Sequence, residues 1–332
     1  MSTKELLLSI CVPTYNRDNL VFKCINSITS QIDESTVEEI AILVVNDKST
    51  DDTELVLSEI NHPCVTVINR KSNMGMSANI YTMLTKDVQS KYTLILTDDD
   101  YLEAGSIQFL VNAIKANILH GSVIWSPRFS YDDDDNLITV ACNDFRESCS
   151  VPPGYISVAK YANSAFILSG LILKMENLKT GIWRNHIENS YFPLLLAGEN
   201  IFINGGGFIQ NKLVYHRVLN KCHWSRWGAT QSAIEYRLLK DKIESFYILK
   251  NFSVTNPFES LKFEMVLLNQ VLVEYLQFFN ENPPRLFSPM KLILIRQSLS
   301  ASFVAFLVYT LTYLFPDLYL VVKRLHRRLL QN

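Results

Sequence analysis

Several short motifs that mark common nucleotide chemistries are missing from this sequence of 332 residues. It contains no GxxxxGK[ST] run, and its glycine run, Gly205–Gly207, lacks the GxGxxG spacing and comes late in the chain. These absences exclude a phosphate-binding P-loop and count against a dinucleotide-binding fingerprint. The six cysteines include no CxxC pair, so we expect reduced cytosolic thiols that mostly fill the core.

The chain also lacks a large net charge, which is formally −2, and we expect no nucleic acid as partner. Its beginning, "MSTKELLLSICV", has one lysine, an apolar stretch of only about seven residues and no small-residue cleavage site, so we expect no signal peptide. The charge is unevenly spread. From Arg285 onward seven basic residues stand against Asp317, a net charge of +6, which leaves −8 for the rest. This polarity favours an anionic membrane surface as neighbour of the C-terminus.

Hydrophobic residues make up 48% of the chain, enough for a core, and their spacing alternates between two patterns. Short apolar runs predict buried strands over residues 6–12, 40–45, 64–68, 92–97 and 122–125, with helical spacing between them. Strands separated by helices imply an α/β fold with a mostly parallel, Rossmann-like sheet and helices on both faces. The polar stretches "VPTYNR", "NDKSTDD", "NRKSNMG" and "TDDDY" each follow a strand, so we expect them to converge on one edge, where such sheets bind ligands.

Beyond Trp125 the pattern is less regular. "FSYDDDDNL" predicts a hairpin turn at Asp132–Asp135, and "INGGGFIQNKLVYHRV" predicts two short strands around a glycine turn. Residues 229–281 again have helical spacing. We therefore expect a domain over 1–228, whose pattern changes after residue 126, followed by a helical region at 229–332 that forms a C-terminal extension.

Three consecutive aspartates, Asp98, Asp99 and Asp100, stand at the end of the fourth predicted strand. A helix cap needs at most one of them. A divalent cation would offset their repulsion, because Mg²⁺ or Mn²⁺ is held by one or two carboxylates together with phosphate oxygens. We expect Asp98 and Asp99 to be the candidate metal ligands, and Asp100 to do no more than start the next helix. A phosphatase of the haloacid-dehalogenase type would carry its aspartates after the first strand, where this chain has "PTYN".

In order and spacing, "SICVPTYNR", "VVNDKSTDDT", "NRKSNMGMSANI" and "LILTDDDYLEAGSI" resemble the family 2 glycosyltransferases, which have the GT-A fold. The resemblance implies an inverting enzyme that takes a sugar from a nucleotide-sugar donor, with a divalent cation as cofactor and a helical C-terminal extension to the fold. Two positions depart from the family pattern: Asn46 and Thr97 stand where many members carry aspartates. The donor-binding residues that the resemblance implies are Pro13, Thr14, Tyr15, Asn16, Arg17, Asp47, Asn73 and Asp98, with Asp47 as the contact to the base. Of the two candidate metal ligands, Asp98 is then the diphosphate-side carboxylate that faces the donor, and Asp99 is the metal-side carboxylate and the expected direct ligand. The resemblance also makes 1–126 the nucleotide-sugar-binding half and 127–228 the acceptor-binding half of the domain.

Such a transfer needs a general base to deprotonate the acceptor hydroxyl. By the resemblance, this base is an acidic residue that opens a helix in the second half of the domain. We expect Glu188, in "HIENSYFPLLLAG", with Glu199 as the reserve. "HWSRWG" partly resembles the QxxRW signature of processive members, and it makes His223, Trp224, Arg226 and Trp227 candidate acceptor contacts.

Residues 297–316 are twenty positions without a charge, followed by the basic amphipathic "VVKRLHRRLL". Three interpretations remain open for them: peripheral or monotopic attachment, which we favour, a true membrane span, or an ordinary buried helical hairpin. Attachment fits a lipid-linked glycan acceptor, as in bacterial O-antigen or capsule assembly, at the cytoplasmic face of the inner membrane. Two rival functions also remain: a sugar nucleotidyltransferase, and a sugar- or nucleotide-binding protein of the same fold without turnover.

Overall fold

The structure is a computed structural model that describes residues 6–132, 136–141, 147–154, 157–158 and 168–217, and also 241, 244–245 and 248–249. The chain forms two compact units, Met1–His223 and Trp224–Asn332, and all the elements below belong to the first. In the second unit the described residues are helical. The domain bounds expected from the sequence stay a prediction.

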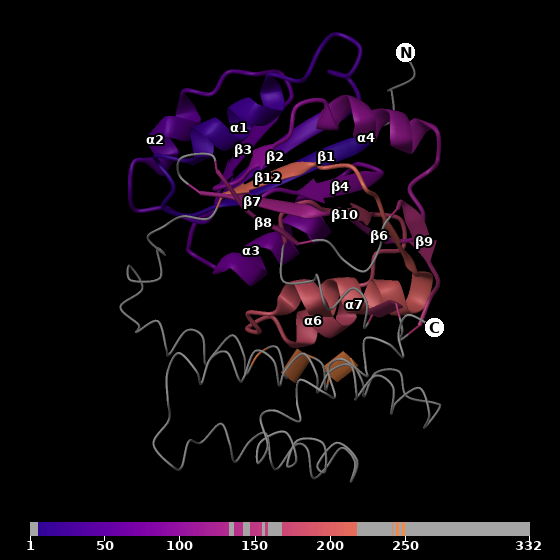
Figure 1. Cartoon of the computed structure of the whole chain (residues 1–332). Coiled ribbons are helices and arrows are strands. Elements are labelled where there is room, and N and C mark those ends of the chain that lie inside the picture. Colours follow the sequence, from indigo (N-terminus) through magenta and orange to yellow (C-terminus); the bar gives the residue numbers. More distant parts are fainter. Residues whose placement is uncertain are drawn as a thin grey trace, which may run out of the picture. The chain divides into compact units, whose positions relative to one another are not determined.

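A large, mostly parallel sheet forms the centre of the first unit (Figure 1), with the strand order β3-β2-β1-β4-β10-β6-β11-β9. Strand β1 is parallel to both β2 and β4, whereas β10 runs antiparallel to its two neighbours and β9 runs antiparallel to β11. The strands are β1 (Leu8–Thr14), β2 (Ile40–Asn46), β3 (Val65–Asn69), β4 (Tyr92–Ile95), β6 (Val123–Trp125), β9 (Cys149–Val151), β10 (Leu171–Lys174) and β11 (Gly206–Phe208).

Helices cover both faces of this sheet (Figure 1). On one side lie α1 (Val21–Thr29), α2 (Thr53–Ser58) and α4 (Ser106–Lys115). On the other lie α3 (Met76–Thr82), which continues as the π-helix η1 (Met83–Asp87), together with α6 (Gly181–Asn185) and α7 (Phe192–Asn204). The fold class expected from the sequence is confirmed.

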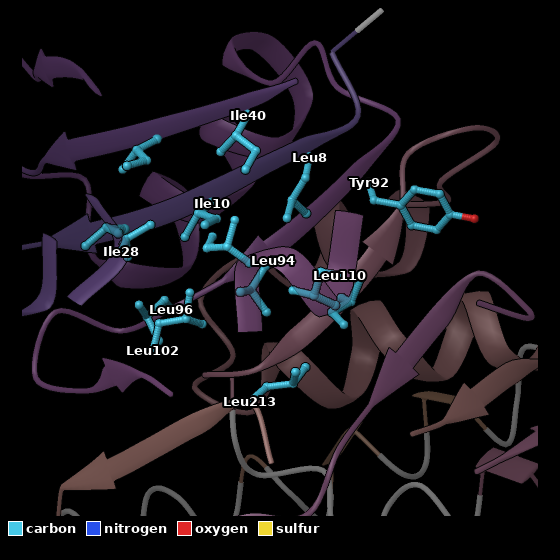
Figure 2. Packing of buried hydrophobic residues seen from close by; sticks show 14 of the residues in the cluster. Leu8, Ile10, Ile28, Ile40, Tyr92, Leu94, Leu96, Leu102, Leu110 and Leu213 are labelled. Atoms are coloured by element: carbon cyan, nitrogen blue, oxygen red, sulfur yellow. The ribbon is translucent and has the colours of Figure 1, made fainter. Parts of the chain in front are cut away.

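The covering helices explain why the strands read as continuous apolar runs. In β1, Leu8, Ile10 and Val12 belong to a hydrophobic cluster that includes residues of α1 and α4. Cys11, which alternates with them, is equally buried but lies outside this cluster. Figure 2 shows the cluster, in which Leu94 of the sheet lies close to Leu110 of α4. Burying a side chain such as Leu110 contributes about 1.5–3 kcal/mol relative to leaving it in water.

A second, smaller sheet follows the order β5-β12-β7-β8. It consists of β5 (Tyr101–Leu102), β7 (Arg128–Tyr131), β8 (Leu137–Ala141) and β12 (Val214–Arg217). Strands β7 and β8 pair antiparallel, which confirms the predicted hairpin at the acidic run. At its turn the N–H of Asn136 donates to Asp132 Oδ1 at 2.8 Å.

The two short strands predicted in this segment are confirmed as β11 and β12, but the prediction that the glycines form the turn between them was wrong. Gly206 and Gly207 lie inside β11, and β12 belongs to the other sheet. A Cβ on Gly206 would come within 2.7 Å of the Val123 carbonyl oxygen, and one on Gly207 within 2.6 Å of the His120 carbonyl oxygen. These glycines therefore allow close strand packing, which sequence alone does not distinguish from a turn.

Candidate functional site

The predicted polar loops do meet at one edge of the large sheet. In β1 and β2, Thr14 lies beside Asn46, and β4 runs parallel on the other side of β1, with Ile95 beside Cys11. The loops that follow these three strands therefore start from the same end of the sheet. This brings together the segment after Thr14, Asp47 after β2, and the aspartates after β4.

Asp98 and Asp99 lie in an environment that opposes their negative charges only in part. The carboxyl group of Asp98 is buried, and its Oδ1 lies 3.4 Å from Nε of Arg17. Burial raises the pKa of Asp98, as does the neighbouring Asp99 carboxylate, while the Arg17 charge lowers it. Burial and then the charge of Asp100 raise the pKa of Asp99, which Arg17 again opposes. The guanidinium of Arg17, from the loop after β1, thus offsets part of the negative charge of Asp98 and Asp99.

Asp100 has a structural role that the sequence did not reveal. Its side chain is fully buried; Oδ2 accepts from the Thr97 hydroxyl at 2.9 Å, and Oδ1 accepts from the Arg217 backbone N–H at 3.0 Å. Oδ2 also lies 2.9 Å from Nδ1 of His216. A carboxylate can only accept, so Nδ1 of His216 donates in this hydrogen bond. The expectation that Asp100 merely starts a helix was wrong: α4 begins at Ser106, and Asp100 joins the acidic loop to β12.

The first loop is held in place by the second. The N–H of Asn16 donates to Ser49 Oγ at 2.9 Å, and Asn16 Oδ1 accepts from the Thr50 N–H at 2.8 Å. The N–H of Arg17 donates to Thr53 Oγ1 at 2.8 Å. Asn16 has a left-handed φ of 55°, which asparagine tolerates better than most residues. These bonds fix the backbone from which Tyr15 and Arg17 project.

Asn46 departs from the family pattern, and both the nitrogen and the oxygen of its side-chain amide form hydrogen bonds. Its Nδ2 donates to Asn69 Oδ1 at 2.9 Å, and its Oδ1 accepts from the Ser49 hydroxyl at 2.6 Å and from the Ser49 N–H at 3.0 Å. A carboxylate could not donate to Asn69. Asparagine at this buried position therefore links the end of β2 to the end of β3.

Asp47, expected to contact the base, also orders the loop before α3. Oδ1 accepts from the Met74 N–H and Oδ2 from the Gly75 N–H, each at 2.9 Å. Burial raises the pKa of Asp47, and these two hydrogen bonds, with the charge of Arg70, oppose that rise. The exposed Asn73 lies in the same loop, and its Oδ1 also accepts from Gly75. Each oxygen of Asp47 has a second lone pair with which a ligand N–H could be bound.

The two candidate bases have different surroundings. Glu188 is exposed in the turn between α6 and α7, four positions before α7 begins at Phe192, so it does not itself open that helix. Glu199 is buried within α7, and its Oε2 accepts from the Ile182 N–H at 3.0 Å. Burial raises the pKa of Glu199; the Ile182 hydrogen bond and the charge of Lys179 oppose this. Glu199 thus supports the start of α6.

Other expected features lie outside the described residues: His223, Trp224, Arg226, Trp227, the uncharged segment 297–316 and the basic stretch after it. Within the part of the chain that the structure describes, no helix is both long and apolar enough to cross a membrane. Nor do three or more His, Cys, Asp or Glu side chains in that part gather closely enough to hold a metal ion. Sequence reasoning missed His216, because nothing local links it to an aspartate 116 positions earlier.

Part of this chain is similar in sequence to known proteins. Residues 9–146 match the family model "Glycosyl transferase family 2". Chondroitin synthase of Escherichia coli is 29% identical over 140 residues, which are 41% of this chain and 19% of that protein. The GalNAc(5)-diNAcBac-PP-undecaprenol beta-1,3-glucosyltransferase of Campylobacter jejuni is 28% identical over 116 residues, 34% of this chain and 36% of that protein. This chain therefore matches well under two thirds of the length of either relative.

A likeness to a solved structure extends further along the chain. The S. aureus TarS 1–349 structure in complex with UDP-GlcNAc superimposes with a TM-score of 0.59 at 16% identity, covering 84% of this chain and 76% of that one. At that identity the likeness shows the fold alone.

Proposed function

Since residues 9–146 match the family model of the family 2 glycosyltransferases, we propose that this protein transfers a sugar from a nucleotide-sugar donor to an oligosaccharide acceptor, with inversion at the anomeric carbon. The observation that carries the proposal is the pair Asp98 and Asp99 at the ligand-binding edge of the sheet, with Arg17 as their nearby cation. Buried carboxylates whose negative charge is offset only in part are typical of a site that is completed by a ligand.

The carboxylates of Asp98 and Asp99 are suitable ligands for a divalent cation such as Mg²⁺ or Mn²⁺. Asp98 and Asp99 offer hard carboxylate oxygens, and burial, together with the neighbouring aspartate, raises the pKa of each more than the Arg17 charge lowers it. We assign the direct ligand role to Asp99 and the donor-facing role to Asp98. A cation held there would carry part of the charge that develops on the departing nucleotide diphosphate.

The loops around this pair would hold the nucleotide. Tyr15 and Arg17 project from a backbone that Ser49 and Thr53 fix, and Asp47 stands at the end of the neighbouring strand. Asp47 would accept a hydrogen bond from the base, and the guanidinium of Arg17 would bind a phosphate oxygen. Pro13, Thr14, Asn16 and Asn73 complete the proposed donor loops.

We assign the general base to Glu188. Glu188 is exposed, as a residue that meets an acceptor must be, whereas Glu199 is buried and accepts a hydrogen bond from the Ile182 N–H. Glu188 would accept the proton of the acceptor hydroxyl as the new bond to the anomeric carbon forms.

The acceptor is proposed to be a lipid-linked glycan in the synthesis of a cell-surface polysaccharide such as O-antigen, at the cytoplasmic face of the inner membrane. The Campylobacter jejuni relative is named for a glycan linked through a diphosphate to undecaprenol, which is a lipid-linked glycan of this kind. In this sequence the uncharged residues 297–316 and the basic stretch after them suit peripheral or monotopic attachment to an anionic leaflet. His223, Trp224, Arg226 and Trp227 remain proposed acceptor contacts.

The test is nucleotide-dependent thermal stability together with turnover. The full chain is screened with UDP-, GDP-, CDP- and dTDP-sugars, with and without Mn²⁺, because a ligand of the native state raises its apparent stability. The matching nucleotide-sugar should raise the unfolding temperature and be hydrolysed slowly, and EDTA should remove both effects. Asp99→Asn should abolish metal-dependent turnover, while Asp52→Asn, an exposed aspartate in the second loop, should behave as wild type.

Three results would count against parts of the proposal. Full turnover by Asp99→Asn would overturn the metal-dependent transferase. Stabilisation by a nucleotide-sugar without any turnover in the wild type would favour the non-catalytic binding protein instead. Full transfer by Glu188→Gln, with loss in Glu199→Gln, would move the base to Glu199.

A further inference from the structure

A buried tryptophan, Trp183, joins helix α3 to the turn that carries Glu188. Trp183 lies in α6, its side chain is fully shielded from solvent, and its Nε1 donates to Oγ of Ser77 at 2.9 Å. Ser77 is the second residue of α3, 106 positions earlier in the chain. Helices α3 and α6 lie on the same side of the large sheet (Figure 1). The hydrogen bond therefore links two segments that are far apart in the sequence.

Aromatic contacts hold the Trp183 ring from two more directions. Tyr81 of α3 meets it edge to face, with ring centroids 5.1 Å apart and planes at 80°. Phe192, the first residue of α7, stacks on it with a centroid distance of 5.1 Å and an angle of 12° between the planes. Both geometries are favoured for aromatic rings. The indole is therefore fixed between α3 and the beginning of α7.

Trp183 also begins the turn in which Glu188 lies. Its carbonyl oxygen accepts from the His186 N–H at 2.9 Å. The carbonyl oxygen of His186 then accepts from the Asn189 N–H at 3.0 Å, and that of Asn189 accepts from the Phe192 N–H at 3.2 Å. Glu188 lies inside this series, which the stacking of Phe192 on Trp183 closes. A shift of Trp183 therefore moves the backbone on both sides of Glu188.

The other end of this connection lies in the proposed donor site. Asp47, to which we assign the contact with the base, accepts from the Met74 and Gly75 N–H groups at 2.9 Å. Ser77 follows Gly75 by two positions, in the first turn of α3. The loop that Asp47 orders is thus directly continuous with the residue that binds Trp183.

We propose that Trp183 is a positioning residue, which sets the place of Glu188 relative to the nucleotide through its bond to Ser77; this rests on the transferase function proposed above. A general base must lie within hydrogen-bond reach of the proton that it accepts. A displacement of about 1 Å that arises far from the chemistry lowers a rate by up to about a hundredfold. Trp183 is fully buried, so it acts on the reaction through Glu188 rather than by contact with a substrate.

A double-mutant cycle on the full chain tests the proposal. Turnover is the release of nucleoside diphosphate from UDP-, GDP-, CDP- and dTDP-sugars with Mn²⁺, where water takes the place of the acceptor hydroxyl. Trp183→Phe keeps an aromatic ring and removes the N–H donor, whereas Ser77→Ala removes only the hydroxyl acceptor. Each should lower kcat about three- to tenfold and leave the dissociation constant of the nucleotide unchanged.

The decisive measurement repeats both changes in the Glu188→Gln background. There neither change should lower kcat further, because the effects of residues that act through one group are not additive. A purely structural role predicts losses that multiply with that of Glu188→Gln. Ser58→Ala is the matched control, because Ser58 Oγ donates to the Leu55 carbonyl oxygen of its own helix, and its kcat should equal that of wild type.

Two results would overturn the inference: an unchanged kcat in both Trp183→Phe and Ser77→Ala, and losses that multiply in the Glu188→Gln background. If Trp183→Phe does not fold, Ser77→Ala decides alone. Multiplying losses in an enzyme whose wild type does turn over refute the inference and leave the transferase standing. A wild type that releases no nucleotide from any of the four donors refutes the transferase, and the inference with it.

Discussion

Replacing Asp100 tests how the acidic loop is joined to the small sheet. In Asp100→Ala the Arg217 N–H and His216 Nδ1 lose a buried, charged acceptor, and the Thr97 hydroxyl loses its partner. Removing one partner of such a buried group costs about 3–5 kcal/mol. Removing a negative charge beside Asp99 offsets on the order of 1 kcal/mol. The net loss should be about 2–4 kcal/mol, which for a unit of this size lowers the thermal midpoint by about 4–16 °C.

The assay is thermal and denaturant unfolding of Asp100→Ala, Asp100→Asn and Asp52→Ala, without metal or nucleotide. Asp100→Asn keeps an oxygen for the Arg217 N–H, and the Thr97 hydroxyl can turn to accept from its amide, so its loss should be nearer 1 kcal/mol. Asp52 is exposed and makes no side-chain cap bond in α2, so its variant should lie within about 0.5 kcal/mol of wild type. If Asp100→Ala unfolds at the same midpoint as Asp52→Ala, the reasoning about a buried link is refuted.

Three further changes have expected outcomes. Thr93 Oγ1 is buried in β4 without a hydrogen-bond partner among the described residues, so Thr93→Val should raise the free energy of unfolding by about 1 kcal/mol; a loss would show that the hydroxyl is bonded. The pKa of Glu199 is raised in the folded state, so its contribution is fully present below the ordinary value and is lost as pH rises through the raised one. Glu199→Gln should therefore gain stability relative to wild type as the pH rises from below the ordinary glutamate pKa through the raised one, and a midpoint difference that stays constant over that rise would contradict the raised pKa. Asn46→Asp cannot donate to Asn69, so denaturant unfolding should show a loss of about 1–2 kcal/mol, and an unchanged midpoint would mean that this bond is not needed.

Local patterns predicted β1, β2, β4 and β6 of the large sheet well because these strands are buried on both faces, whereas β9 and β10 were not predicted. A strand such as β2 reads as an unbroken apolar run, and the helices between strands keep their 3.6-residue spacing. The gathering of Tyr15, Asp47 and Asp98 at one edge followed from the parallel arrangement alone. Glycine was harder to interpret, because a residue without a Cβ serves both turns and close packing, as Gly206 does in β11.

The sequence by itself determined the order of strands and helices in the first half, the edge that carries the acidic loop, and the likeness of residues 9–146 to the family 2 glycosyltransferases. Only the tertiary structure decided what each polar side chain does there. Asp100 binds His216 across 116 positions, and Asn46 binds Asn69 across 23. Apolar periodicity is a property of neighbours in the chain, whereas the partner of a buried polar group depends on which distant residue the fold brings within about 3 Å. The repulsion in the acidic run is accordingly met in three ways: Arg17 faces Asp98, β12 binds Asp100, and Asp99 is left to the proposed cation.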